Sequence, residues 1–119
     1  MDLSVVIPTK NEAGNIGELI ARTRRVIGQL GIEAEILVVD GNSTDGTCEK
    51  AEAAGALAIR DGGNCYGDAL RTGLRQARGR FILTMDSDLS HEPEFLERMW
   101  ALREEAEIGD KSEAFEEDR

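Results

Sequence analysis

Residues 81–88 read FILTMDSD, an apolar run that passes directly into two acids. The apolar part is typical of a buried strand, and the acids stand at its carboxyl end. Because side chains alternate along an extended chain, Ser87 is expected to point away from both acids. Asp86 and Asp88 can therefore reach one hard cation from the same side, and carboxylate oxygens are ligands that such cations prefer.

Two other segments repeat this plan of an apolar strand followed by a polar turn. They are residues 5–12, VVIPTKNE, and residues 36–47, ILVVDGNSTDGT. The chain between these segments carries apolar residues at helical spacing, so strands and helices are expected to alternate four times. The strands are expected at 3–8, 36–39, 56–59 and 80–85. The helices are expected to begin after Asn15, after Ser43 or Thr44, after the glycine-rich residues 61–65, and at Pro93.

This alternation predicts an α/β domain with parallel strands joined by right-handed crossovers. We expect the strand order 3-2-1-4, in which the chain reverses direction between the first and fourth strands. Open α/β sheets bind ligands in the crevice that such a reversal opens at the carboxyl ends of the strands. Residues 8–12, Asp40 and residues 86–88 all fall there, so three separate segments converge on one predicted site.

Composition limits what this site can bind. The chain has 119 residues with 40% hydrophobic content, which suits a single core. Its formal net charge of −10 argues against a nucleic-acid partner, because phosphate backbones are bound by clustered basic residues. There is no apolar run long enough to span a bilayer, no signal-peptide layout at the amino end and no metal-binding cysteine spacing. We therefore expect a cytoplasmic protein, with residues 109–119 forming an acidic, disordered tail.

Four segments in order resemble family 2 inverting glycosyltransferases with the GT-A fold. They are residues 6–12 (VIPTKNE), 38–47 (VVDGNSTDGT), 67–74 (GDALRTGL) and 85–93 (MDSDLSHEP). Within that family the chain is most similar to the polyprenyl-phosphate (dolichol-phosphate) mannose synthases. The resemblance implies a Rossmann-like, three-layer GT-A domain in which residues 1–108 form the nucleotide-sugar-binding half.

The resemblance also implies roles for individual residues. The nucleotide would be bound by Pro8, Thr9, Glu12, Asp40 and Asp86, and Mg²⁺ or Mn²⁺ would be held by Asp86, Asp88 and Ser90. The donor would be GDP-mannose or a UDP-hexose. The acceptor would be a polyprenyl phosphate at the membrane surface, or another hydroxyl compound, with the protein cytoplasmic or peripheral to the membrane.

Some positions depart from the family pattern. Lys10 stands where relatives often have Tyr, Gly41 stands where they often have a second Asp, and the loop at residues 64–66 lacks the usual Gly or Lys. The segments that supply the catalytic base and the acceptor site in the family would follow residue 108, so the resemblance assigns no catalytic base and implies a truncated domain.

Several alternatives stay open at this stage. The chain can be the donor side of an enzyme, a non-catalytic nucleotide-binding module, or, less in keeping with the position of the acids, a phosphotransferase with an aspartate nucleophile. Asp40 can instead form a local turn leading into Gly41. We also expect a homo-oligomer, because the fourth strand would lie at an uncovered edge of the sheet.

Overall fold

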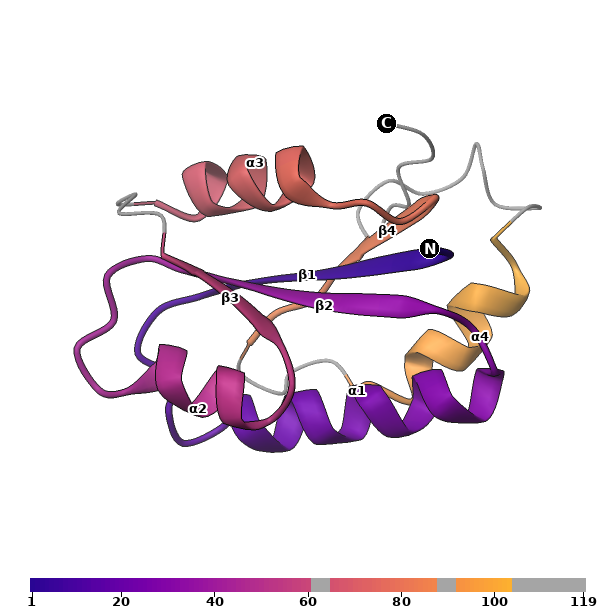
Figure 1. The fold of residues 1–119 in the computed structure, drawn as a ribbon, viewed down its shortest axis with the longest axis horizontal. Coiled ribbons are helices and arrows are strands. Elements are labelled where there is room, and N and C mark those ends of the chain that lie inside the picture. Colours follow the sequence, from indigo (N-terminus) through magenta and orange to yellow (C-terminus); the bar gives the residue numbers. More distant parts are fainter. Residues whose placement is uncertain (61–64, 88–91, 104–119) are drawn as a thin grey trace.

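The computed structural model describes residues 1–60, 65–87 and 92–103, and these form three layers (Figure 1). The strands are β1 (Leu3–Thr9), β2 (Ala34–Asp40), β3 (Leu57–Arg60) and β4 (Phe81–Thr84). The helices are α1 (Ile16–Leu30), α2 (Thr47–Ala53), α3 (Tyr66–Gln76) and α4 (Phe95–Ala101). Within these residues the sheet is parallel and has the order β3-β2-β1-β4, which confirms the predicted topology.

Each strand of the sheet centre contributes to two cores because its side chains alternate. Val5 and Ile7 pack with α1, α2 and α4 on one face, whereas Val6 packs with α3 on the other. Figure 1 shows this arrangement, with α3 alone above the sheet and the other helices below it. All seven residues of β1 are buried, which explains why this strand reads as a continuous apolar run.

Helix α3 lies unusually close to the sheet because its inner face is made of small residues. Ala69 and Gly73 are buried against the sheet. A Cβ atom added at Gly73 would lie 2.4 Å from Cγ1 of Val6, a distance that real side chains do not reach. The glycine therefore sets the separation between helix and strand.

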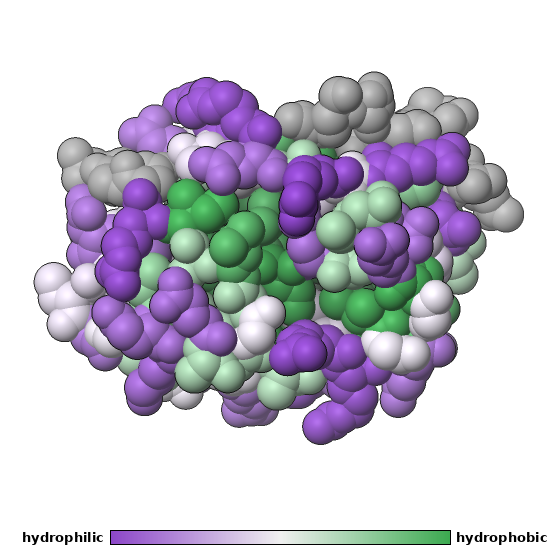
Figure 2. Space-filling view, viewed as in Figure 1, coloured by the Kyte–Doolittle hydropathy of each residue, from purple (hydrophilic) through white to green (hydrophobic). Residues whose placement is uncertain are grey.

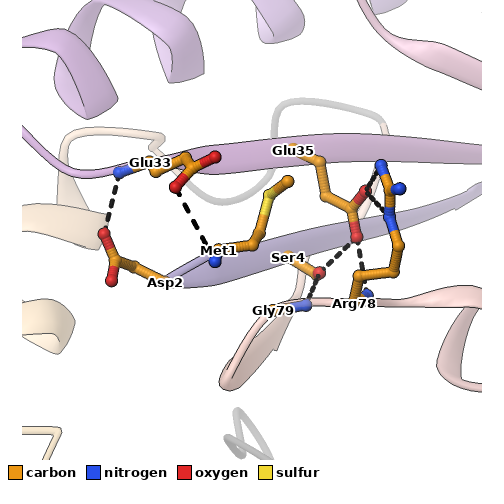
Figure 3. Close-up of polar contacts among 7 residues, drawn as sticks. All are labelled: Met1, Asp2, Ser4, Glu33, Glu35, Arg78 and Gly79. Carbon is orange, nitrogen blue, oxygen red and sulfur yellow. Dashed lines mark hydrogen bonds and ion pairs between the residues drawn. The ribbon is translucent and has the colours of Figure 1, made fainter.

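A polar cluster joins β1, β2 and the turn before β4 at the amino ends of the strands (Figure 3). The hydroxyl of Ser4 donates to Glu35 Oε2 at 2.6 Å and accepts from the Gly79 N–H at 2.7 Å. The Arg78 N–H donates to the same Glu35 oxygen at 2.8 Å, and its guanidinium lies 3.3 Å from Glu35 Oε1. Since Ser4 is fully buried and the Glu35 side chain is only 10% exposed, these bonds satisfy a hydroxyl and a carboxylate that have little access to water.

The apolar surface that remains visible lies between the two helix layers. Figure 2 shows hydrophobic side chains there, in the view in which β3 runs along the near edge of the sheet. Leu57 of β3 is 54% exposed. No helix in the described ranges is long and apolar enough to cross a bilayer.

The helix start predicted after Asn15 is confirmed, whereas the starts predicted for α2 and α4 were wrong, because α4 begins at Phe95 and not at Pro93. Asn15 does precede α1, but within the described chain its side chain donates to Glu12 Oε1 and does not cap the helix. Helix α2 begins at Thr47 after Gly46, several residues later than Ser43 or Thr44 would place it. The later start of α2 has a physical cause, because the Ser43 side chain bonds to Asp40 and to the Asn11 N–H instead of capping its own helix.

Helix α4 and the residue after it bury only some of their apolar side chains. Leu96 is buried, and Met99 and Trp100 pack against the core beneath β4. Phe95 is 39% exposed, however, and Leu102 lies beyond the last helical residue. Helix α1 ends before Gly31, which has the left-handed conformation (φ 69°) that favours glycine.

Candidate functional site

A cavity of about 450 Å³ opens at the carboxyl ends of the strands, on the left in Figure 1. Its volume is in the range of small-ligand sites. Four segments line it: the end of β1, the turn after β2, the start of α3 and the turn after β4. The lining residues are Pro8, Thr9, Lys10, Glu12, Gly41, Cys65, Tyr66, Ala69, Asp86 and Ser87.

The structure brings four of the predicted site residues together in this cavity. Pro8, Thr9 and Glu12 line it from the β1 side, and Asp86 lines it from the β4 side. The predicted metal ligands Asp88 and Ser90 lie outside the described residues. The ends of β1 and β4 therefore meet at this cavity as expected. Every predicted site residue of these two segments that the structure describes lines it.

Thr9 is the cavity residue with the clearest unmet bonding capacity. Its side chain is buried, with 6% exposure, and it stands at the last position of β1. Within the described part of the chain, its Oγ1 atom has no hydrogen-bond partner. A buried hydroxyl without a partner costs about 1–3 kcal/mol, so a ligand group that bonds to it gains correspondingly.

Asp40 is not among the cavity residues. It is 1% exposed, and its carboxylate accepts hydrogen bonds from both the N–H and the hydroxyl of Ser43. The N–H of Gly41 continues the sheet by donating to the Thr9 carbonyl at 3.0 Å. The alternative interpretation of Asp40, as the residue that forms the turn after β2, is the one that this geometry supports.

Charged and aromatic groups face each other across the cavity. Lys10, Glu12 and Asp86 supply the charges, and Tyr66 supplies a phenol at the first position of α3. Partial burial, and secondarily the negative charge of Asp86, raise the pKa of the Tyr66 hydroxyl. At neutral pH the Tyr66 side chain is therefore a neutral hydrogen-bond donor beside a carboxylate.

The sequence interpretation did not assign a role to the start of α3. Cys65, Tyr66 and Ala69 line the cavity, whereas residues 64–66 had been considered only as a departure from the family pattern. A topological signal was available, because a helix that follows a parallel strand begins at the carboxyl edge of the sheet. The start of α3 therefore had to lie near the ends of β1 and β4.

The donor types at the cavity suit a hard divalent cation. Asp86 places a carboxylate there, and carboxylate oxygens are ordinary ligands of Mg²⁺ and Mn²⁺. The described residues do not by themselves form a cluster of three His, Cys, Asp or Glu side chains. A metal at this position would therefore use Asp86 together with ligands from a nucleotide, from water or from the rest of the chain.

Comparison with known proteins identifies the family. Residues 4–109 match the family described as Glycosyl transferase family 2. The chain belongs to this family. The family 2 transferase that is named undecaprenyl-phosphate 4-deoxy-4-formamido-L-arabinose transferase in Pseudomonas fluorescens is 37% identical over 117 residues, covering 90% of this chain and 33% of the relative. The protein of the same name from Proteus mirabilis is 36% identical over 111 residues, covering 87% of this chain and 34% of the relative.

Solved structures agree on the fold. Glucosyl-3-phosphoglycerate synthase of Mycobacterium tuberculosis superposes with a TM-score of 0.74 at 28% identity, covering 86% of this chain and 40% of that one. A structure of that synthase in complex with Mn²⁺, UDP-glucose and phosphoglyceric acid gives a TM-score of 0.67 at 28% identity, covering 80% and 36%. The predicted GT-A fold is thus confirmed, and this family 2 chain spans about a third of the length of the curated relatives it matches.

Proposed function

We propose that this chain binds the nucleoside diphosphate part of a nucleotide sugar together with Mg²⁺ or Mn²⁺, as the donor side of an inverting glycosyltransferase. The observation that carries the proposal is the cavity at the carboxyl ends of β1 and β4, where the buried Thr9 hydroxyl lacks a partner within the described residues. Residues 1–108 are proposed to form this donor-binding half.

The two sides of the cavity suit the two ends of the ligand. Pro8, Thr9 and Glu12 offer an apolar ring, a hydroxyl and a carboxylate, which fit a nucleoside with its ring face and its N–H and O–H donors. Asp86, on the β4 side, is the proposed metal ligand, joined by Asp88 and Ser90. Asp40 would act on the nucleotide through the turn it anchors, since a direct bond to the base would require its bonds to Ser43 to break.

The metal would neutralise charge that builds up on the departing nucleoside diphosphate and so improve the leaving group. Lys10 lies at the same cavity and adds one positive charge of the chain's own. The Tyr66 hydroxyl, which is protonated at neutral pH, can donate a hydrogen bond to a phosphate oxygen. These residues bind and orient the donor, and the catalytic base is proposed to lie elsewhere.

The choice of nucleotide, sugar and acceptor follows the relatives. Complexes of the structural neighbour with UDP-glucose and Mn²⁺ favour a UDP-hexose over GDP-mannose as the donor. The curated relatives are named as undecaprenyl-phosphate sugar transferases, which supports a polyprenyl-phosphate acceptor and therefore a place at the membrane surface. Among the described residues, β4 is an edge strand of the sheet. This supports the proposed homo-oligomer, in which a second copy of the chain pairs with β4.

Isothermal titration of the folded chain with UDP and with GDP, in Mn²⁺ and in chelator, tests the proposal. We expect UDP to bind more tightly with Mn²⁺, and Asp86→Asn to remove that difference. Thr9→Val keeps the side-chain shape and removes the hydroxyl, so it should weaken UDP binding by about tenfold, the value of one hydrogen bond. Glu97→Gln, an exposed change on α4, is the matched control and should bind as the unmodified chain does. Equal binding with and without metal, or no nucleotide binding at all, would contradict the proposal.

A further inference from the structure

Three consecutive backbone N–H groups of the loop between β1 and α1 donate to side chains of the turn between β2 and α2. The N–H of Asn11 donates to Ser43 Oγ at 2.7 Å, and that of Glu12 donates to Thr47 Oγ1 at 3.0 Å. The N–H of Ala13 donates to Asp45 Oδ2 at 3.1 Å. The partners are 32 to 35 residues away in sequence, so these bonds fix one loop against the other.

The two loops also bond in the opposite direction. The Thr44 N–H donates to Asn11 Oδ1 at 2.9 Å, and Asn11 holds the left-handed conformation (φ 53°). Asn is one of the few residues that adopts this conformation readily, and the bond accounts for its use here. These hydrogen bonds in both directions favour a single conformation of the β1–α1 loop.

This arrangement changes what the β1–α1 loop can do for an anionic ligand. Successive loop N–H groups often cradle phosphate in α/β proteins. Here the three N–H groups are already bonded to side chains, so the loop contributes its side chains to the cavity and not its amides. Lys10 and Glu12, which line the cavity, sit directly on this bonded segment.

Asp45 is the centre of the contact. Its Oδ2 atom accepts from Ala13, while its Oδ1 atom accepts from both the N–H and the hydroxyl of Thr47. Thr47 is fully buried, and its hydroxyl oxygen accepts from Glu12 in turn. The hydrogen bond from Thr47, followed by those from backbone N–H groups, lowers the pKa of the Asp45 carboxyl, so it is ionised at neutral pH.

We propose that Asp45 is a positioning residue of the nucleotide site, which holds the cavity wall at residues 10–13 in its binding conformation through Ala13 and Thr47. The inference rests on the proposed nucleotide binding. It adds a residue that does not line the cavity and that acts on the ligand only through the loop it holds. Without it, the loop would have to order on binding, and ordering lowers affinity.

Asp45→Ala and Asp45→Asn test this in the 119-residue chain. Asparagine keeps one oxygen that can accept from Thr47 but replaces the oxygen that accepts from Ala13 with a donor. The rate of amide hydrogen exchange is measured by NMR in the protein without nucleotide. In Asp45→Ala we expect the amides of Glu12 and Ala13 to exchange at least tenfold faster. In Asp45→Asn the acceleration should be confined to Ala13. The affinity for UDP with Mn²⁺ should fall about tenfold in the alanine variant and less in the asparagine variant.

Two controls separate positioning from general loss of stability. Glu49→Gln changes an exposed acid on α2 that pairs with Arg60 and lies outside the hydrogen bonds described above between the two loops. This variant should therefore leave the exchange rates and the UDP affinity unchanged. Ser4→Ala weakens the far end of the sheet, so it should lower stability without changing UDP affinity at a temperature where it is folded.

Unchanged exchange at residues 11–13 in Asp45→Ala would overturn the inference, as would wild-type UDP affinity in that variant. If the unmodified chain itself fails to bind UDP, the proposed function fails, and the exchange measurement still decides whether Asp45 holds the loop. If the alanine variant does not fold, the asparagine variant gives the same two readouts.

Discussion

Replacement of Gly73 by alanine should destabilise the protein although alanine is the better helix former. The new Cβ would lie 2.4 Å from Val6 Cγ1 and 3.2 Å from Val39 Cγ2, both in the buried sheet centre. Overpacking of this kind costs about 1–3 kcal/mol. The gain in helix propensity offsets roughly 1 kcal/mol of that cost. We therefore expect Gly73→Ala to lower the free energy of unfolding by up to about 2 kcal/mol.

Gly28→Ala is the matched control, since it makes the same chemical change in a helix with no atom within 4 Å of the added Cβ. It should raise the free energy of unfolding by about 0.5–1 kcal/mol, or less because it lies near the end of α1. The difference between the two variants isolates the packing cost of bringing α3 closer to β1 than a side chain allows.

Urea unfolding and thermal unfolding, both monitored by circular dichroism, measure both variants. For a domain of this size a change of 1 kcal/mol shifts the melting temperature by about 4 °C, so the melting temperatures of the two variants should differ by roughly 2–12 °C. Gly73→Ala should also weaken UDP binding, because α3 carries Cys65, Tyr66 and Ala69 into the cavity. If Gly73→Ala is as stable as Gly28→Ala, the close approach of helix and sheet does not limit this position and the reasoning fails.

Two further predictions concern polar groups. Ser4→Ala leaves the buried Gly79 N–H without its acceptor and removes one donor to Glu35. Urea unfolding should therefore show that the free energy of unfolding falls by about 1–3 kcal/mol. A fall of less than about 0.5 kcal/mol would mean that water or a shifted turn replaces the hydroxyl. Hydrogen bonds from Thr47 and Arg22 lower the pKa values of Asp45 and Glu94 below their usual 3.8 and 4.5. A carboxyl whose folded pKa is lowered stabilises the fold above its unfolded pKa and loses that effect as the pH falls through the folded value. The urea midpoint should therefore decline as the pH drops below about 4.5, and Glu94→Gln should make that decline shallower; an unchanged decline in Glu94→Gln would show that the ion pair with Arg22 has no part in it.

The sheet could be predicted from the sequence because its information is local. The apolar runs that end at Pro8, Val39 and Met85 predict three of the strands. Because strands alternate with helices along the chain, only a few sheet topologies are possible. Strand ends moved by one or two residues. For example, β2 begins at Ala34 instead of Ile36, because pairing with buried β1 extends it beyond its apolar part.

The turns could not be predicted to the same degree because their bonds are long-range. Ser43 is a good cap by composition, yet it bonds to Asp40 and to the Asn11 N–H. No local pattern indicates that Asp45 accepts a hydrogen bond from Ala13, 32 residues earlier. The cavity was predicted where two strand ends meet, whereas the role of α3 required knowledge of how near its first turn lies to Asp86.

The place of β1 in the middle of the sheet has a consequence for synthesis of the chain. Leu3 pairs with Ala34 on one side and with Phe81 on the other. During translation the first partner is made about 31 residues after Leu3, but the second only about 78 residues after it. At about 5–20 residues per second, β1 waits roughly 4–16 s for its second neighbour. A growing chain therefore carries a half-paired, mostly apolar strand on the ribosome for seconds. Slow codons between β2 and β4 should lengthen the interval in which this strand can associate with other chains.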